Sequence, residues 1–261
     1  MQQLLDTLNN LTPVLIIVSL AVFMTIEKYL PYFEHGMGRG KQRWYNIGMI
    51  ALAFIINAVV GGLIAIPLIW SENNHFGLLH RLFGTTPLSI IIGIFLIDLT
   101  SYGLHVIMHK VPVLWRFHRI HHADTEMDST SSLRLHPLEL LLQMAVQAVI
   151  LPLIGVSIAS FIFYFTLALP WFVLNHSNIK FPGWFERFGS LLMSTPDWHR
   201  VHHSSFQPET DSHYGCLFSI WDRLFGTGGK VNVEKIRFGL DRFRGAGDQT
   251  IWRMLKMPFT K

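Results

Sequence analysis

Long apolar runs alternate with short polar segments along most of the chain, and this pattern predicts helices that span a membrane. Residues 11–30, 47–69 and 87–109 are each predominantly apolar and long enough to cross a hydrocarbon core of about 30 Å at roughly 1.5 Å per residue. A fourth apolar stretch, residues 138–175, is interrupted between Pro152 and Gly155, which favours a hairpin of two helices. We therefore expect an all-α integral membrane helical bundle of three spans plus a helical hairpin.

The basic residues predict how this bundle is oriented. Arg39, Lys41 and Arg43 lie among glycines after the first span, in a loop that begins near His35, and the positive-inside rule places such a loop in the cytoplasm. The N-terminus is then outside, and the third span ends on the cytoplasmic side. The hairpin enters and leaves on that same side, so the basic tail, residues 227–261, is cytoplasmic as well. Residues 1–261 are expected to form a single domain in the cell inner membrane or an equivalent membrane.

Composition supports membrane residence and narrows the available chemistry. Hydrophobic residues make up 50% of the chain and charged residues 15%, and the mean hydropathy is +0.35, which is too apolar for an ordinary soluble domain. Cytoplasmic bases explain the net charge of +4, and because no basic stripe carries stacking aromatics we expect no nucleic-acid partner. Cys216 is the single cysteine, so the chain has no internal disulfide and no CxxC motif, and imidazole is its main metal-binding group.

Histidines cluster with helical spacing in three places. His105 and His109 stand one turn apart as HVIMH, and the pattern HxxHH occurs twice, as HRIHH at residues 118–122 and as HRVHH at residues 199–203. The predicted topology puts all of them on the cytoplasmic side, so that they can share one site. Neutral imidazoles favour iron, zinc or copper, whereas magnesium and calcium prefer oxygen ligands. We therefore predict a cytoplasmic histidine-rich cap that holds a dimetal site.

These motifs and their flanking sequences resemble the sterol desaturase and fatty acid hydroxylase superfamily of membrane di-iron enzymes. The resemblance is carried by HVIMH, by HRIHH with the downstream segment MDSTSSLRLHPLE, by the pair Asn175 and His176, and by HRVHH followed by DSHYG. It covers residues 98–226 as a histidine-box catalytic region, and it implies two iron ions, with zinc as a substitute in purified protein, and dioxygen as co-substrate. The metal ligands that it implies are His105, His109, His118, His121, His122, His176, His199, His202 and His203.

Other polar residues are candidates for supporting these ligands or for binding a metal themselves. His136 matches the RxHP segment of the family and is expected beside the site rather than on a metal. Some relatives carry another histidine four residues from the position of His176, where this chain has Phe172 and Lys180, so that corner is open to water, substrate or His136. His213 replaces an asparagine of many relatives and is a weaker candidate ligand. The carboxylates that could hold ligand N–H groups, or equally cap helices or form ion pairs, are Asp98, Glu126, Asp128, Glu139, Asp197 and Asp211.

The resemblance implies an oxidoreductase that hydroxylates or desaturates a membrane lipid, in lipid or sterol biosynthesis. Such a reaction needs electrons, yet the chain has no dinucleotide-binding GxGxxG, and GTGGK at residues 226–230 lacks the first glycine and the Ser/Thr of a P-loop. We therefore expect an external electron-donor protein of the ferredoxin or cytochrome type. Arg116, Arg119 and Arg200 either form its docking face or reflect the positive-inside bias.

Two alternatives remain open on the sequence. A binuclear zinc hydrolase of lipid esters would work without oxygen or reductant, although the HExxH and GxSxG motifs are absent. A non-enzymatic metal-binding or haem-binding membrane protein would also use histidines between helices, although a transporter would place them near the middle of the bilayer.

Overall fold

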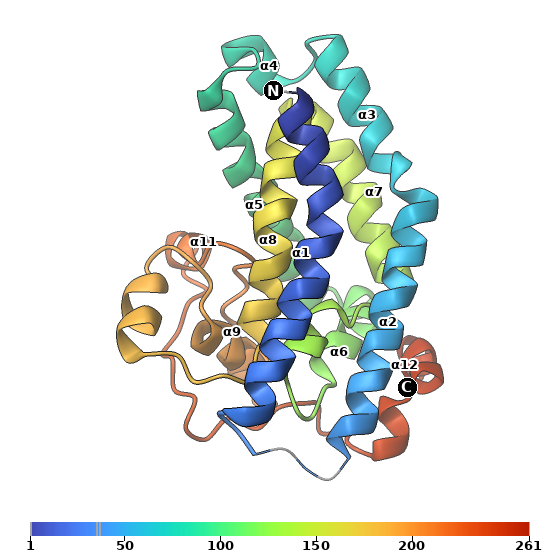
Figure 1. The fold of residues 1–261 in the computed structure, drawn as a ribbon, viewed down its shortest axis with the longest axis vertical. Coiled ribbons are helices and arrows are strands. Elements are labelled where there is room, and N and C mark those ends of the chain that lie inside the picture. The colour runs from blue at the N-terminus through green and yellow to red at the C-terminus, as the bar shows by residue number, and fades with distance from the viewer. Residues whose placement is uncertain (1, 35, 37, 261) are drawn as a thin grey trace.

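Five helices of the computed structural model are long and apolar enough to cross a membrane (Figure 1). They are α1 (Gln2–Tyr29), α2 (Arg39–Val60), α5 (Pro87–Lys110), α7 (Pro137–Ile154) and α8 (Ile158–His176). The structure describes residues 2–34, 36 and 38–260, and within these ranges it contains helices and turns but no β-strand. His35, where the predicted basic loop begins, lies outside the described residues. The chain is an integral membrane protein, as its apolar runs predict.

Shorter helices complete the two ends of the bundle (Figure 1). α3 (Gly62–Asn73) and α4 (Leu78–Phe83) reach the end where the chain begins. The opposite end carries a cap, which is built from α6 (Pro112–His122), α9 (Pro196–His202), α10 (Gln207–Thr210), α11 (Ile220–Leu224) and α12 (Ile251–Lys256). One π-helical turn, Phe185–Gly189, and three 3-10 turns, Ser129–Leu133, Ala246–Gln249 and Met257–Phe259, join these helices.

Proline and glycine set the ends of the helices that surround the cap. α5, α6 and α7 begin with Pro87, Pro112 and Pro137, at a first-turn position where the missing N–H of proline is not needed. α7 ends at Gly155, whose φ of +81° is the left-handed conformation that favours glycine. Consequently α5 gives way to α6 in a sharp turn, and α7 and α8 form a helical hairpin.

The second apolar run differs from its prediction. The sequence indicated a basic loop followed by one span over residues 47–69. α2 already begins at Arg39 and stops at Val60, and α3 starts after it. The helix extends back because Arg39 and Arg43, one turn apart, both reach a buried carboxylate: their Nε atoms donate to Asp128 Oδ2 at 2.7 and 2.6 Å. The break falls at the glycine pair, residues 61–62, because glycine is a poor helix former.

α1 shows how the bundle meets lipid. Val14, Ile17 and Val22 are 50%, 61% and 47% exposed, whereas Ile16 is buried, and α1 packs along α8. A continuous exposed apolar surface of this kind is stable in hydrocarbon and not in water.

Asp98 connects the bundle to the cap. This fully buried carboxylate of α5 accepts a hydrogen bond from Tyr164 Oη of α8 at 2.7 Å. From the cap it accepts the backbone N–H groups of Leu217 and Phe218, each at 3.1 Å, and Nε1 of Trp221 at 2.8 Å. These four bonds use its acceptor capacity, so Asp98 does not hold a ligand N–H as the sequence suggested but fixes the position of the cap.

Candidate metal centre

Nine buried histidines from four helices and their ends meet where the bundle joins the cap. They form two groups, and within each group the nitrogens available to a metal all lie within 4.8 Å of one another. The first group is His105, His109, His118, His122 and His202, and the second is His121, His176, His199 and His203. All the histidines implied by the family resemblance are therefore brought together.

The two HxxHH motifs are divided between the groups in a crossed manner. In residues 118–122 the first and last histidines, one helical turn apart, join the first group, while His121 joins the second. In residues 199–203 the first and last histidines join the second group, while His202 joins the first. Each motif thus gives two nitrogens to one group and one to the other, and neither group is complete without both motifs.

In the first group, nitrogen lone pairs face one another. His105 Nδ1 donates to the carbonyl oxygen of Tyr214 at 2.9 Å and His202 Nδ1 to that of Ser212 at 2.7 Å, so each neutral ring carries its proton on Nδ1. Their Nε2 atoms are 3.0 Å apart. Lone pairs at this distance repel each other unless a cation lies between them, and two nitrogens bound to one ion at about 2.1 Å and at right angles are roughly 3 Å apart. The residues present therefore fit a metal ion.

The second group repeats this arrangement with one histidine fewer. His176 Nδ1 donates to the carbonyl oxygen of Phe172 at 2.7 Å, which leaves Nε2 as the free acceptor. That Nε2 lies 3.2 Å from His121 Nε2 and 3.1 Å from His199 Nε2. The same lone-pair argument applies, so the second group also fits a cation.

The two histidine groups are in direct contact. The ring of His122, in the first group, stacks on that of His203, in the second, with centroids 4.5 Å apart and planes at 18°. The rings of His199 and His202 are 5.4 Å apart. Two ions bound here would be neighbours, as a binuclear centre requires. Nitrogens this close within each group leave no room for a porphyrin, which disfavours the haem alternative.

Burial keeps the cap histidines neutral. Desolvation lowers the pKa of His121, His199 and His202 well below the usual range, and neighbouring imidazoles lower it further because charged rings would repel one another. Neutral imidazole is the form that binds metals.

Two of the carboxylates considered from the sequence lie beside ligand rings. Glu139, at the start of α7, accepts a hydrogen bond from His118 Nδ1 at 2.7 Å and is 1% exposed. Asp211 Oδ1 lies 3.5 Å from His109 Nδ1. The hydrogen bond to Glu139 can fix the tautomer and orientation of the His118 imidazole, whereas His109 Nδ1 makes no hydrogen bond to Asp211.

The other candidate carboxylates have other partners. Asp128 binds Arg39 and Arg43 of α2, and Asp197 pairs with Arg200 Nη1 at 2.5 Å. Glu126 Oε1 accepts a backbone N–H close to the start of α2 at 2.8 Å. The ion-pair alternative noted from the sequence therefore describes Asp128 and Asp197, and neither holds a ligand ring.

His136 and His213 lie outside both groups. His136 caps α7, since its Nδ1 accepts the N–H of Leu138 at 3.1 Å, and its Nε2 lies 3.2 Å from the carbonyl oxygen of Leu255. The ring of His213 packs edge-on against Trp198, with centroids 4.4 Å apart. Both rings have local structural partners, so neither supplies a further nitrogen to the second group.

Asp124 is a buried residue near the site that the sequence analysis did not single out. It accepts hydrogen bonds from Asn46 Nδ2 at 2.8 Å and Ser131 Oγ at 2.7 Å. Burial alone would raise its pKa, but Arg39 and Arg134 lower the pKa to about 2. The carboxylate thereby fixes α2 beside the segment that follows HRIHH. Its position directly after that motif is the sequence feature that could have indicated this role.

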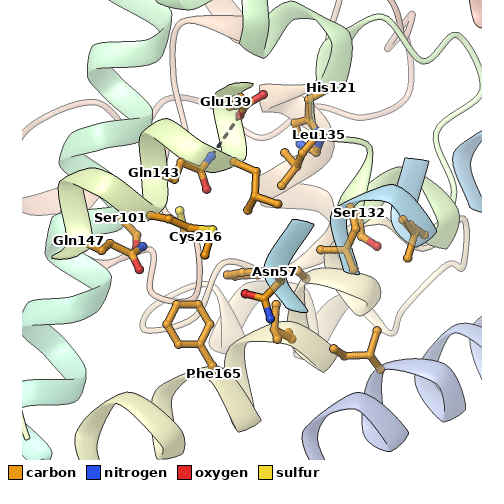
Figure 2. Close-up of a pocket in the computed structure, with 18 of the residues that line it drawn as sticks. Asn57, Ser101, His121, Ser132, Leu135, Glu139, Gln143, Gln147, Phe165 and Cys216 are labelled. Carbon is orange, nitrogen blue, oxygen red and sulfur yellow. Dashed lines mark hydrogen bonds between the residues drawn. The ribbon is translucent and has the colours of Figure 1, made fainter. Parts of the chain in front are cut away.

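A cavity of about 410 Å³ leads from the histidines into the bundle between α1, α2, α5, α7 and α8 (Figure 2). Histidines of both groups close one end, and apolar side chains such as Met108, Met144 and Leu169 form much of the wall. The volume lies within the range of small-molecule sites. Two polar lining residues, Gln143 and Gln147, were not singled out from the sequence, although they follow Glu139 at helical spacing.

The protein is a helical membrane protein with two adjacent groups of buried histidines at one end of its bundle. Such an arrangement is suited to a buried metal site. The chain belongs to the fatty acid hydroxylase family, whose model matches residues 90–227, and this confirms the resemblance that the motifs indicated. The ornithine lipid hydroxylase OlsE of Rhizobium tropici is 30% identical over 140 residues, which cover 53% of this chain and 41% of that protein.

Two further relatives extend the comparison. The alkylglycerol monooxygenase of Homo sapiens is 29% identical over 156 residues, or 55% of this chain and 31% of that protein. The very-long-chain aldehyde decarbonylase GL1-9 of Oryza sativa subsp. indica is 29% identical over 151 residues, or 57% of each chain. The match therefore spans less than two thirds of each of these relatives. No solved structure gives a significant match.

Proposed function

We propose that the protein is an oxidoreductase that uses dioxygen and a di-iron centre to hydroxylate a C–H bond of a membrane lipid. The observation that carries this proposal is that two adjacent histidine groups close one end of a largely apolar cavity inside a membrane bundle. A lipid chain can extend from the membrane bundle through this cavity to the histidines. The names of two relatives, a lipid hydroxylase and a monooxygenase, favour hydroxylation over desaturation.

In this proposal each histidine group holds one iron ion. The five imidazoles of the first group would hold one ion and the four of the second group the other, and water or substrate would occupy the corner beside Phe172, where some relatives have another histidine. When bound, iron supplies the one-electron redox chemistry that an unactivated C–H bond requires and that zinc lacks. Zinc can occupy the same nitrogens in purified protein and would leave it inactive.

The reaction balances with an external reductant. Hydroxylation consumes one dioxygen, two electrons and two protons: one oxygen atom becomes the hydroxyl group of the lipid, and the other leaves as water. Glu139 and the carbonyl groups of Tyr214 and Ser212 keep ring protons on Nδ1, so that Nε2 stays free for the metal. Apolar walls such as Met108 keep water away from the reacting carbon.

The electrons come from a separate redox protein of the ferredoxin or cytochrome type. We place the histidine groups and the cap in the cytoplasm, with the N-terminus outside, in the cell inner membrane or an equivalent membrane. Of the three arginines considered for docking, Arg200 is buried and donates to the carbonyl oxygen of Ser177 at 2.6 Å, and Arg119 donates to that of Thr260 at 2.9 Å. Arg116 is exposed, so it is the arginine that can contact a partner.

Lipid mass spectrometry under isotopically labelled dioxygen tests the proposal. Membranes that contain the protein should gain a lipid heavier by one labelled oxygen atom, and His118→Ala or His202→Ala should abolish both this product and iron retention. His75→Ala, on the exposed loop at the other end of the bundle, is the matched control and should behave as wild type. A lipid product that forms equally well without oxygen would instead support the zinc hydrolase and contradict the proposal.

A further inference from the structure

The cavity contains carboxamides that have no partner in the protein. Gln147 of α7 is 8% exposed, and Asn57, an exposed residue of α2, lines the same cavity (Figure 2). Among the residues that the structure describes, none shares a hydrogen bond with either side chain. Gln143, by contrast, donates to Glu139 Oε1 at 3.1 Å. An unpaired amide in an apolar environment costs about 1–3 kcal/mol, and polar groups inside membrane helices commonly mark a ligand path.

Helical spacing gives the distance along α7 between Gln147 and Glu139, the residue that touches the histidines. Glu139 touches His118, and Gln143 and Gln147 follow it at i+4 and i+8 on the same face of α7. Eight residues of helix rise about 12 Å. The part of α8 that lines the cavity, residues 161–176, rises roughly 22 Å, so the cavity is elongated and Gln147 faces its interior.

The walls of the cavity select against an ionic group. Among the described residues that line it, Glu139 is the single carboxylate and there is no lysine or arginine. A phosphate or a free carboxylate would find no cation, and an ammonium group would find a carboxylate already bonded to His118. A carboxamide both donates and accepts, which matches an uncharged amide or hydroxyl group.

We propose that Gln147, assisted by Asn57, binds an uncharged hydrogen-bonding group part-way along the lipid substrate. If the protein oxidises a lipid as proposed above, the distance from this bound group then sets which carbon of the lipid is oxidised. Three bonds of an extended chain span about 3.3–3.6 Å, so roughly 12 Å corresponds to about ten bonds between the bound group and the carbon at the histidines.

Native mass spectrometry of the full chain in detergent measures this preference directly. The protein is offered an equimolar mixture of three ligands of equal chain length: a mid-chain secondary amide, a mid-chain alcohol and an alkane. The wild type should retain the amide or the alcohol about tenfold over the alkane, as one or two net hydrogen bonds would give. Gln147→Met should reduce this ratio to within about twofold and leave alkane retention unchanged, and Asn57→Leu should reduce it in part.

Asn10→Leu is the matched control, since Asn10 is an exposed residue of α1 outside the cavity lining, and it should keep the wild-type ratio. Equal retention of all three ligands by the wild type overturns the proposal. So does a tenfold ratio that survives in the double variant with Gln147→Met and Asn57→Leu, because a group other than these two carboxamides would then bind the polar group of the ligand. Ligand retention does not require that the protein oxidise the ligand. A protein that oxidises no lipid but keeps the tenfold preference for polar ligands would therefore refute the proposed function and leave this inference standing.

Discussion

Glu139, in the first turn of α7, touches both the candidate metal centre and the cavity. Its Oε1 accepts from His118 Nδ1 at 2.7 Å and from Gln143 Nε2 at 3.1 Å. We predict that Glu139→Leu weakens iron binding about 10-fold to 100-fold, because a ligating imidazole that loses its outer partner loses its orientation. Glu139→Gln, which can still accept the Nδ1–H bond, should lose less. The iron content after dialysis against a chelator measures both effects.

Asp241→Asn provides the control for this series, since Asp241 is an exposed cap carboxylate that pairs with Arg237 at 3.4 Å. Iron content that is the same in Glu139→Leu and in Asp241→Asn would mean that Glu139 does not hold a metal ligand.

At the residue scale, spacing predicts which histidines share a helix face but not which group each one joins. His121 and His122 are neighbours in sequence, yet they belong to different groups because the ring of His121 meets His176 of α8, whereas the ring of His122 meets His202 of α9. That outcome depends on how helices far apart in the chain face each other. Gln147 was missed for a similar reason: a single glutamine in an apolar run is informative only once the cavity beside it is known.

At the scale of elements, buried ion pairs join α2 to the cap. Arg39 is 5% exposed and Asp128 is fully buried, and Asp128 also accepts from Arg43. We predict that Asp128→Asn destabilises the protein by about 1–3 kcal/mol, because Arg39 and Arg43 each lose one buried carboxylate but keep a second, Asp124 and Glu27 respectively. Thermal unfolding in detergent measures the loss, with Asp241→Asn as the exposed control. An unfolding temperature unchanged from that control would show that these charges do not stabilise the cap.

Apolar periodicity predicted the long helices but not the start of α2. A basic, glycine-rich segment is typical of a loop. Arg39 is helical because it binds carboxylates, and these lie about 85–90 residues further along the chain. A contact over that separation leaves no local signal. The break at Gly155, in contrast, follows from glycine and proline within the segment itself, which is why the sequence indicated it.

At the scale of the whole molecule, the orientation in the membrane is a prediction from the positive-inside rule. Cys216 is the single cysteine of the chain and lies in the cavity wall, so new cysteines can report each face. A membrane-impermeant maleimide should label Asn74→Cys in intact cells, because Asn74 is exposed at the N-terminal end of the bundle. Asp241→Cys, in the cap, should be labelled only after the membrane is opened. The reverse pattern would place the cap outside.

The iron content of the protein shows directly whether two adjacent ions are bound by its histidines. Elemental analysis of protein loaded with ferrous iron without oxygen should find two ions per chain, one for each histidine group. His176→Ala, which removes a nitrogen from the second group alone, should leave about one ion per chain. A wild-type protein that binds one ion or none, or a His176→Ala variant that still binds two, would contradict a binuclear centre with one ion in each histidine group.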